Sequence, residues 1–176
     1  AAGGFSLPKR LAVAVSGGSD SLLALGLLRR AGHDILAIHA HFLPPDAAQE
    51  GLARAIAAQC ATLGVPFFAI DCAAAFREQV IEPFLRAYVG GQTPNPCVTC
   101  NRTMKFGLLL EKARELGADG LATGHYARLE SGPDGVALSR GDDASRDQSY
   151  FLAMVPRQAL AQAHFPLARR HKADNP

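Results

Sequence analysis

Residues 9–34 read KRLAVAVSGGSDSLLALGLLRRAGHD, and this stretch decides the fold. Leu11 to Val15 is a short apolar run, which is typical of a buried β-strand. The run stops at Ser16-Gly17-Gly18, and the leucine-rich stretch that follows predicts a helix that ends at Gly32. We therefore expect a strand, a glycine loop and a helix in direct succession.

The same alternation continues along the chain. Residues 34–41 (DILAIHAH) predict a second strand, 47–63 an alanine-rich helix before Gly64, and 66–70 a third strand. A fourth strand is expected at 119–123. This order is typical of a parallel sheet with right-handed crossovers and helices on both faces. The predicted fold class is α/β, with three α/β/α layers.

A longer segment separates the third and fourth strands. Residues 73–88 predict a helix, and 102–116 predict another with Asn101 as its N-cap. Between them, residues 89–101 (VGGQTPNPCVTCN) contain two Gly and two Pro and predict an irregular loop. Long loops in compact domains usually carry function, so this loop is a candidate site.

The chain beyond the fourth strand is less regular. Residues 130–135 (ESGPDG) separate two alternating runs and predict a β-hairpin, and 148–163 predict a helix with a break at Pro156. From Pro166 the chain is polar and basic, with no evident partner element. We expect a flexible N-terminus at 1–8, a folded domain at 9–165, and a truncated connector at 166–176.

Composition narrows the class of protein. The 176 residues are 48% hydrophobic and 19% charged, which suits one packed domain and excludes a disordered chain. No apolar run reaches the roughly 20 residues that span a bilayer. The start, Ala1-Ala2-Gly3-Gly4, has no signal-peptide core. The net charge of +2 does not by itself indicate nucleic acid. We expect a cytoplasmic protein.

The loop Ser16 to Ser21 (SGGSDS) carries the first chemical signal. Free backbone N–H groups and the helix dipole favour an anion here, and the glycines let phosphate oxygens approach. The serine hydroxyls could add donors. Asp20 would repel a phosphate unless a cation lay between them, so it is the expected Mg²⁺ ligand. The loop lacks the lysine of GxxxxGKS/T, which argues against γ-phosphoryl transfer. A tight turn with a helix cap is the alternative.

Four further blocks sharpen the interpretation: 91–101 (GQTPNPCVTCN), 105–107 (KFG), 122–128 (ATGHYAR) and 146–152 (RDQSYFL). With the loop, which resembles the PP-loop signature SGGxDS, they follow the order of blocks in the tRNA-specific 2-thiouridylase family. The resemblance implies an adenine nucleotide alpha hydrolase-like fold. It also implies adenylation of the C2 oxygen of the wobble uridine, pyrophosphate release, and replacement of that oxygen by persulfide sulfur. An older family name is tRNA methyltransferase, but no methyl-donor site is evident.

The resemblance also implies roles for individual residues. Asp20, Cys100 and Cys97 are the expected catalytic residues. ATP is expected to contact the loop, two strand ends and one glycine: Ala14, Val15, Ser16, Gly17, Gly18, Ser19, Asp20, Ser21, Ala40 and Gly124. The tRNA is expected to contact Asn95, Pro96, Cys97, His125, Arg146, Asp147 and Gln148. His39 and His41 share one face of the second strand, and we expect them at its surface end.

Cys100 matches the family's nucleophile in NPDxxCN. It directly precedes the predicted cap Asn101, and Arg102 and Lys105 lie nearby. Positive potential of this kind lowers the pKa of a thiol and favours the thiolate. We therefore expect Cys100 to carry sulfur.

Cys97 stands where the family's commonest form has aspartate. The resulting Cys97-x-x-Cys100 pair could form a disulfide, hold half of a zinc site, or supply two ligands to an iron–sulfur cluster such as a 4Fe–4S cluster. Cys60 and Cys72 are expected to fill the core. The resemblance places a second catalytic cysteine of the family beyond the end of this chain.

The expected cofactors are thus ATP and Mg²⁺, with the cluster as an open alternative. The expected partners are tRNA and a persulfide-carrying sulfur donor, and neither DNA nor a membrane. Two rival hypotheses remain: an ATP-binding or sulfur-carrying module with another substrate, and a redox or cluster-sensing domain built on Cys97 and Cys100.

Overall fold

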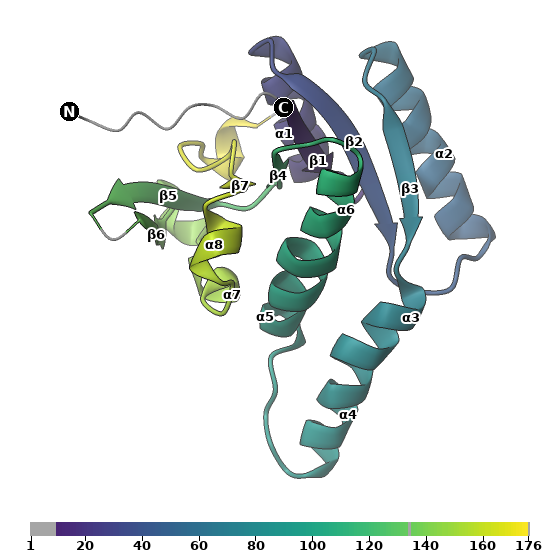
Figure 1. Ribbon diagram of the computed structural model, residues 1–176, viewed down its shortest axis with the longest axis vertical. Helices are drawn as coiled ribbons and strands as arrows, with labels where there is room; N and C mark the ends of the chain where they lie inside the picture. Colours follow the sequence, from purple (N-terminus) through teal and green to yellow (C-terminus); the bar gives the residue numbers. More distant parts are fainter. Residues whose placement is uncertain (1–9, 134, 176) are drawn as a thin grey trace.

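The computed structural model describes residues 10–133 and 135–175, so the expected flexible segment 1–8 lies outside the described residues. Five parallel strands form the central sheet in the order β3-β2-β1-β4-β7 (Figure 1). Their bounds are β1 Arg10–Ala14, β2 Asp34–His41, β3 Phe67–Asp71, β4 Gly120–Ala122 and β7 Ala163–His164. The first four agree with the predicted strands to within one or two residues.

Both faces of the inner strands β1, β2 and β4 are buried, which explains their continuous apolar runs. On β1, Leu11 and Val13 belong to one hydrophobic core and Ala12 belongs to the other. On β2, Ile35 and Leu36 divide in the same way. Successive side chains of a strand point to opposite faces, so β1 and β2 each contribute to both cores. The three-layer α/β/α prediction is confirmed.

Two helices cover the first face. Helix α1 spans Ser19–Arg30 and α2 spans Ala47–Thr62. Asp46 caps α2, since its Oδ1 accepts a hydrogen bond of 2.8 Å from the Gln49 amide. The helices therefore begin and end close to where the sequence predicts.

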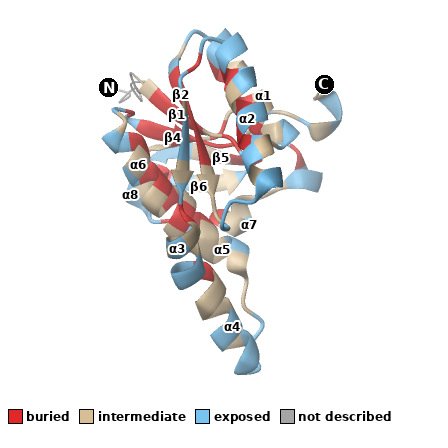
Figure 2. Ribbon diagram, turned by 90° about the vertical axis from the view of Figure 1, so that its right-hand side faces the viewer, coloured by how far each residue is buried: buried red, intermediate tan, exposed pale blue. Residues whose placement is uncertain are grey.

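The other face is covered by helical stretches that include π-helical turns. The first contains α3 Ala73–Phe76, η1 Arg77–Ile81 and α4 Glu82–Val89, and α4 protrudes from the sheet with no buried residue (Figures 1 and 2). The second contains α5 Pro96–Cys100, η2 Asn101–Leu109 and α6 Leu110–Glu115, and it packs against the sheet.

The predicted loop 89–101 is too long, because the helix already begins at Pro96. Proline is favoured in the first turn of a helix, where its missing N–H removes no hydrogen bond. Asn95 caps this turn: its Oδ1 accepts from the amides of Cys97 at 3.1 Å and Val98 at 3.4 Å. Asn101 is therefore not an N-cap but lies inside a continuing helix.

The hairpin prediction is confirmed as β5 Ala127–Gly132 paired with β6 Gly135–Arg140. The predicted helix at 148–163 is wrong in part. The chain forms two short helices, α7 Ser149–Leu152 and α8 Arg157–Leu160, and then the edge strand β7. A strand of two residues shows no sequence periodicity, so only its pairing with β4 reveals it.

The stretch after residue 165 does have partners, contrary to the expectation that it lacks one. In its 3-10 turn, η4 Lys172–Asp174, the Lys172 amide donates a hydrogen bond of 2.8 Å to the side chain of Asp143, which lies just after the hairpin in the chain. No helix within residues 10–133 and 135–175 combines the length and hydropathy that a membrane span requires.

Candidate functional site

A cavity of about 470 Å³ lies at the carboxyl ends of β1, β2 and β4. In doubly wound α/β folds this edge of the sheet is where ligands bind. The cavity wall includes every predicted ATP contact except Gly17, namely Ala14, Val15, Ser16, Gly18, Ser19, Asp20, Ser21, Ala40 and Gly124. Residues that are far apart in the chain are thus brought around one space.

The loop at the start of α1 presents unpaired backbone donors. Within the described ranges, the N–H groups of Gly17, Ser19 and Asp20 have no acceptor. Gly17 has a φ of +85°, and a Cβ there would lie 2.6 Å from the Leu52 side chain. The loop therefore needs glycine at this position in order to turn its amides outward.

Ser21 has a different role from the one predicted. Its hydroxyl donates to the Gly18 carbonyl at 2.8 Å and accepts from the Ser16 amide at 3.1 Å. Ser21 is buried. Its hydroxyl holds the loop in shape and is not free to donate to a phosphate.

Asp20 is the centre of a hydrogen-bonded group drawn from distant segments. Its Oδ1 accepts a hydrogen bond of 2.9 Å from the Tyr126 hydroxyl and forms an ion pair with Lys172. Lys172 also donates to the Ser19 hydroxyl at 3.1 Å, and the Asn175 amide donates to the Tyr126 hydroxyl at 2.6 Å. Burial and the bond to Asp20 raise the pKa of Tyr126 to about 12, so its hydroxyl remains a donor.

Gly124 allows the end of β4 to approach α1. A Cβ at Gly124 would lie 2.9 Å from the Asp20 carbonyl carbon and oxygen and 3.0 Å from the Ser21 nitrogen. These are backbone atoms, which cannot rotate away. A side chain here would push the strand end from the loop.

His125 lies in the cavity wall and is buried. The Thr123 hydroxyl and the His125 Nδ1 are 2.7 Å apart, and the ring packs beside Phe106 and Phe165. Burial, with a smaller effect from the charge of Lys105, lowers the pKa of His125 to about 3. The imidazole is therefore neutral at physiological pH.

The cysteine helix differs in charge from the prediction. Burial raises the pKa of the Cys100 thiol, Lys105 opposes this increase, and Cys97 adds to it. The expected lowering of the thiol pKa is wrong because the effect of burial exceeds that of Lys105. Cys100 also lies at the end of α5, within a continuing helix, and not at a helix N-terminus. Cys97 is exposed, and Cys100 is half-buried.

Asn101 links the cysteine-bearing helix α5 to α7. Its Nδ2 donates to the Cys97 carbonyl at 3.0 Å and to the Phe151 carbonyl at 3.2 Å. The cysteine-bearing turn is therefore held against α7.

The other two cysteines fill the core as predicted. Cys60 and Cys72 are buried, and burial raises the pKa of each thiol. In the part of the chain that the structure describes, no three His, Cys, Asp or Glu side chains are placed to hold a metal ion. Cys97 and Cys100 alone do not fit an iron–sulfur cluster, which needs further ligands.

The side chains of the predicted tRNA contacts Arg146, Asp147 and Gln148 have different surroundings. Arg146 is exposed. Asp147 accepts from the Ser149 amide at 3.0 Å and lies 3.5 Å from the Arg140 guanidinium. Gln148 lines the cavity, and its Oε1 accepts from the Tyr126 amide at 3.1 Å. Gln148 thus supports the strand end that carries His125.

The expectation that His39 lies at a surface strand end is wrong. His39 is buried, its Nδ1 is 2.7 Å from the Val15 carbonyl oxygen, and it lines the cavity. Its ring meets that of His41 edge to face, with centroids 4.9 Å apart.

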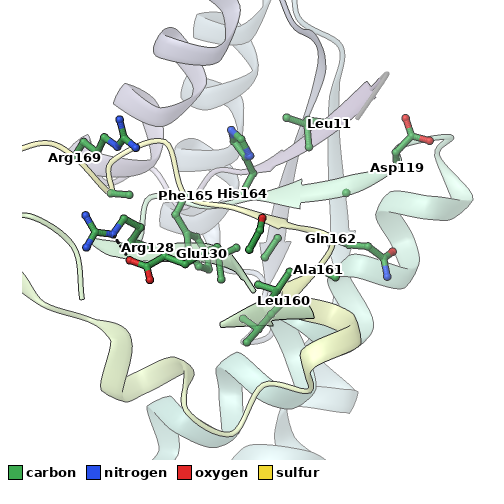
Figure 3. A pocket seen from close by; sticks show the side chains of 16 residues that line it. Leu11, Asp119, Arg128, Glu130, Leu160, Ala161, Gln162, His164, Phe165 and Arg169 are labelled. Carbon is green, nitrogen blue, oxygen red and sulfur yellow. Dashed lines mark hydrogen bonds and ion pairs between the residues drawn. The ribbon is translucent and has the colours of Figure 1, made fainter. Parts of the chain in front are cut away.

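A larger cavity of about 840 Å³ lies between the hairpin and the β4–β7 edge, near the amino ends of β1 and β4 (Figure 3). Its wall holds the ion pair of Arg128 and Glu130 at 3.1 Å, with His164 on β7 nearby. It contains none of the predicted site residues. Because ligands of this fold class bind at the carboxyl ends of the strands, we assign the functional site to the smaller cavity.

Sequence reasoning missed three groups of the site. Lys172 and Tyr126 reach Asp20, and His39 lines the cavity. Tyr126 lies within the block ATGHYAR, which the sequence analysis had already assigned to the site. Nothing in the local pattern around Lys172 indicates a contact with the loop.

Comparison with known proteins agrees with the predicted resemblance. The chain is 55% identical over 168 residues to the tRNA-specific 2-thiouridylase MnmA of Nitratidesulfovibrio vulgaris strain Miyazaki F, covering 93% of this chain and 48% of the relative. It is 54% identical over 173 residues to the protein of the same name from Oleidesulfovibrio alaskensis, with the same coverage. The chain thus spans about half the length of these curated relatives.

A solved structure supports the fold. The predicted subunit of a tRNA methyltransferase from Methanocaldococcus jannaschii superposes with a TM-score of 0.58 at 20% identity, covering 93% of this chain and 70% of that one. The family model described as the tRNA methyl transferase HUP domain matches residues 9–175. The resemblance inferred from the sequence blocks is confirmed, and the chain belongs to the tRNA methyl transferase HUP domain family.

Proposed function

We propose that this chain is the ATP-binding domain that adenylates the wobble uridine of tRNA during 2-thiouridine formation. One observation carries the proposal. The glycine loop, whose Gly17, Ser19 and Asp20 N–H groups have no acceptor among the described residues, borders a cavity that is also lined by the helical stretch bearing Cys100. The relatives reported above, which are tRNA-specific 2-thiouridylases, support it. This function places the protein in the cytoplasm, where its tRNA substrate is found.

ATP would bind with its phosphates on the loop amides. Backbone N–H groups at a helix N-terminus attract phosphate, and α1 directs its positive end at the cavity. The volume of about 470 Å³ lies within the usual range of small-molecule sites. Ala14 and Ala40, at the ends of β1 and β2, would contact the adenosine part.

Magnesium fits the same loop. The Oδ1 atom of Asp20 is occupied by Tyr126 and Lys172, but its Oδ2 makes no bond with any residue that the structure describes. One carboxylate oxygen together with substrate phosphates is a common Mg²⁺ environment. A bound Mg²⁺ would offset phosphate charge and orient the leaving pyrophosphate. The adenylation domain proposed at 9–165 thus receives Lys172 from the segment that follows it.

The tRNA would approach over the cysteine helix and the segment after the hairpin. Asn95, Pro96 and Cys97 form the start of α5, and Arg146 is exposed and free of the cavity. An exposed arginine suits a tRNA phosphate. Because His125 and Gln148 lie in the cavity wall and Asp147 supports α7, we propose that they shape the uridine site and do not grip the backbone.

Sulfur would arrive at Cys100 from a persulfide-carrying protein. Cys100 is half-buried beside the cavity lysine, whereas Cys97 is exposed. We therefore propose that Cys97 receives incoming reagents first and that Cys100 faces the activated base. A cluster would need ligands from outside the described residues, so an iron-free protein with full adenylation activity is the expected result.

The test is pyrophosphate release with ATP and tRNA. Asp20→Ala should abolish release while the protein stays folded, because the cation ligand is lost. Asp142→Ala is the matched control, since Asp142 loses only an ion pair with Arg128 away from the cavity. Unchanged release by Asp20→Ala would remove the assignment. For Cys100, mass spectrometry after incubation with a sulfur donor should find a persulfide, and one found only at other cysteines would refute the role.

A further inference from the structure

Lys105 is a lysine in the cavity wall whose ammonium has no bonded partner. The structure describes two other lysines, and both are paired: Lys112 with Glu115 at 2.7 Å, and Lys172 with Asp20. Lys105 makes no hydrogen bond or ion pair with any residue in 10–133 or 135–175. It is also only partly exposed, and burial lowers its pKa. A cation withdrawn from water without a counter-charge is unfavourable, so this position is prepared for an anion.

The π-helical segment η2 places Lys105 in the cavity wall, just beyond the cysteines in the chain. This segment runs from Asn101 to Leu109, and π-helices bond residue i to residue i+5. Cys100 and Lys105 are separated by that spacing, so Lys105 lies one wide turn beyond Cys100. The charge of Lys105 acts on the thiols of Cys100 and Cys97 and on the ring of His125. Lys105 lines the same cavity as Gly124 and His125, which follow the end of β4.

Lys105 also differs from the other cations near the loop. It is the only lysine or arginine among the described residues that line the cavity. Lys172 does not line the cavity and is already paired with Asp20 and Ser19, and Arg102, on the same segment as Lys105, is exposed. The cavity thus has two anion-binding parts: the loop amides, and Lys105 on the wall formed by the cysteine helix.

We propose that Lys105 is a catalytic residue that holds the α-phosphate of ATP, the phosphate that is transferred to the uridine. This role rests on the proposed function. In the adenylation step the uridine C2 oxygen attacks the α-phosphorus, and the bond from that phosphorus to the pyrophosphate oxygen breaks. Pyrophosphate leaves with the electron pair of that bond, and the N3 proton of uridine goes to solvent.

The Lys105 ammonium offsets the negative charge that gathers on the α-phosphoryl oxygens in this step. The amides of Gly17, Ser19 and Asp20 remain to bind the departing pyrophosphate. After transfer the same phosphate, now on the uridine, stays against the helical stretch that carries both Lys105 and Cys100. One lysine thereby activates the base and keeps it where sulfur must reach it.

The experiment compares Lys105→Met, Lys105→Arg and the control Lys112→Met, a lysine farther along the same helical stretch and outside the cavity. Exchange between ATP and pyrophosphate is measured with tRNA, ATP affinity by calorimetry, and folding by thermal unfolding. Lys105→Met should lose about 10²–10³-fold in exchange rate, the range for removing one preorganised donor. Its ATP affinity should fall less than its rate, because the loop amides remain. Lys112→Met should match the unaltered protein.

A second readout separates a catalytic from a structural role. Alkylation of Cys100, followed by mass spectrometry, should shift to higher pH in Lys105→Met, because the cation that opposes the raised thiol pKa is gone. Lys105→Arg should keep most of the exchange rate. If Lys105→Met folds poorly, a folded Lys105→Arg that loses more than about 10²-fold would refute the charge role.

The failures of the two proposals are distinguishable. Exchange by Lys105→Met within twofold of the unaltered protein would overturn the role of Lys105 and leave the proposed function standing. Absence of exchange in the unaltered protein, folded and supplied with tRNA and Mg²⁺, would overturn the proposed function and this role with it.

Discussion

Replacing Gly124 with alanine tests whether the close approach of β4 and α1 builds the ATP site. The new Cβ would lie 2.9 Å from the backbone carbonyl of Asp20. Ordinary carbon contacts are about 3.5–4.0 Å, so the two backbones must separate by roughly 0.6–1.1 Å. Overpacking of this kind lowers the free energy of unfolding by about 1–3 kcal/mol. A displacement near 1 Å at a reaction site lowers rates by about 10²-fold.

The assay pairs urea unfolding with calorimetric titration of ATP and Mg²⁺. Gly26→Ala is the control: it lies in α1, the same helix, and nothing lies within 4 Å of its added Cβ. Because glycine inside a helix is unfavourable relative to alanine, Gly26→Ala should raise the free energy of unfolding by about 0.5–1 kcal/mol. The two glycine-to-alanine changes should therefore have opposite signs.

The reasoning would be refuted by Gly124→Ala protein that unfolds at the same urea concentration as the unaltered protein and binds ATP equally well. Weakened ATP binding with unchanged stability would show that the contact positions the loop without straining the fold. Such a result would locate the separation at the loop and leave the strand in place.

Three further outcomes are expected. Burial lowers the pKa of His125 from 6.5 to about 3, so its neutral form contributes stability that is lost as the pH falls from 6.5 toward 3. His125→Phe should therefore lose less unfolding free energy than the unaltered protein in that pH range. An unchanged slope of unfolding free energy against pH would contradict this. The pKa of Tyr126 is raised from 10.0 to about 12, so the stability that its protonated hydroxyl contributes is lost as the pH rises through that interval. Ultraviolet titration should show one of the three tyrosines ionising last, and Tyr126→Phe should remove that step. Iodoacetamide should modify the exposed Cys97 before Cys100, whose thiol pKa is raised by burial, and peptide mapping that found Cys100 modified first would contradict this order.

The parts of the site that are local in sequence could be predicted from it. The glycine loop, its acid and the end of β4 each belong to a short contiguous pattern, and parallel strands bring their carboxyl ends to one edge. That is why Asp20 and Gly124 line the same cavity as predicted, although they are far apart in the chain.

The charge state of Cys100 could not be predicted in this way. Sequence neighbours indicated a helix N-terminus and a lowered pKa, but the Asn95 cap starts the helix earlier and leaves Cys100 half-buried inside it. A thiol pKa depends on solvent exclusion and on which charges face it, and both are properties of packing.

The sequence by itself determined the α/β order, the two-sided burial of the inner strands and the glycine loop before the first helix, because these follow from hydrophobic period and from glycine at a strand–helix junction. Only the tertiary structure decided what surrounds Asp20: Tyr126 is 106 residues away in sequence and Lys172 is 152. It also decided that Lys105 lies in the cavity wall with no bonded partner among the described residues. Contacts across such separations depend on how elements pack against one another, and no local spacing carries that information.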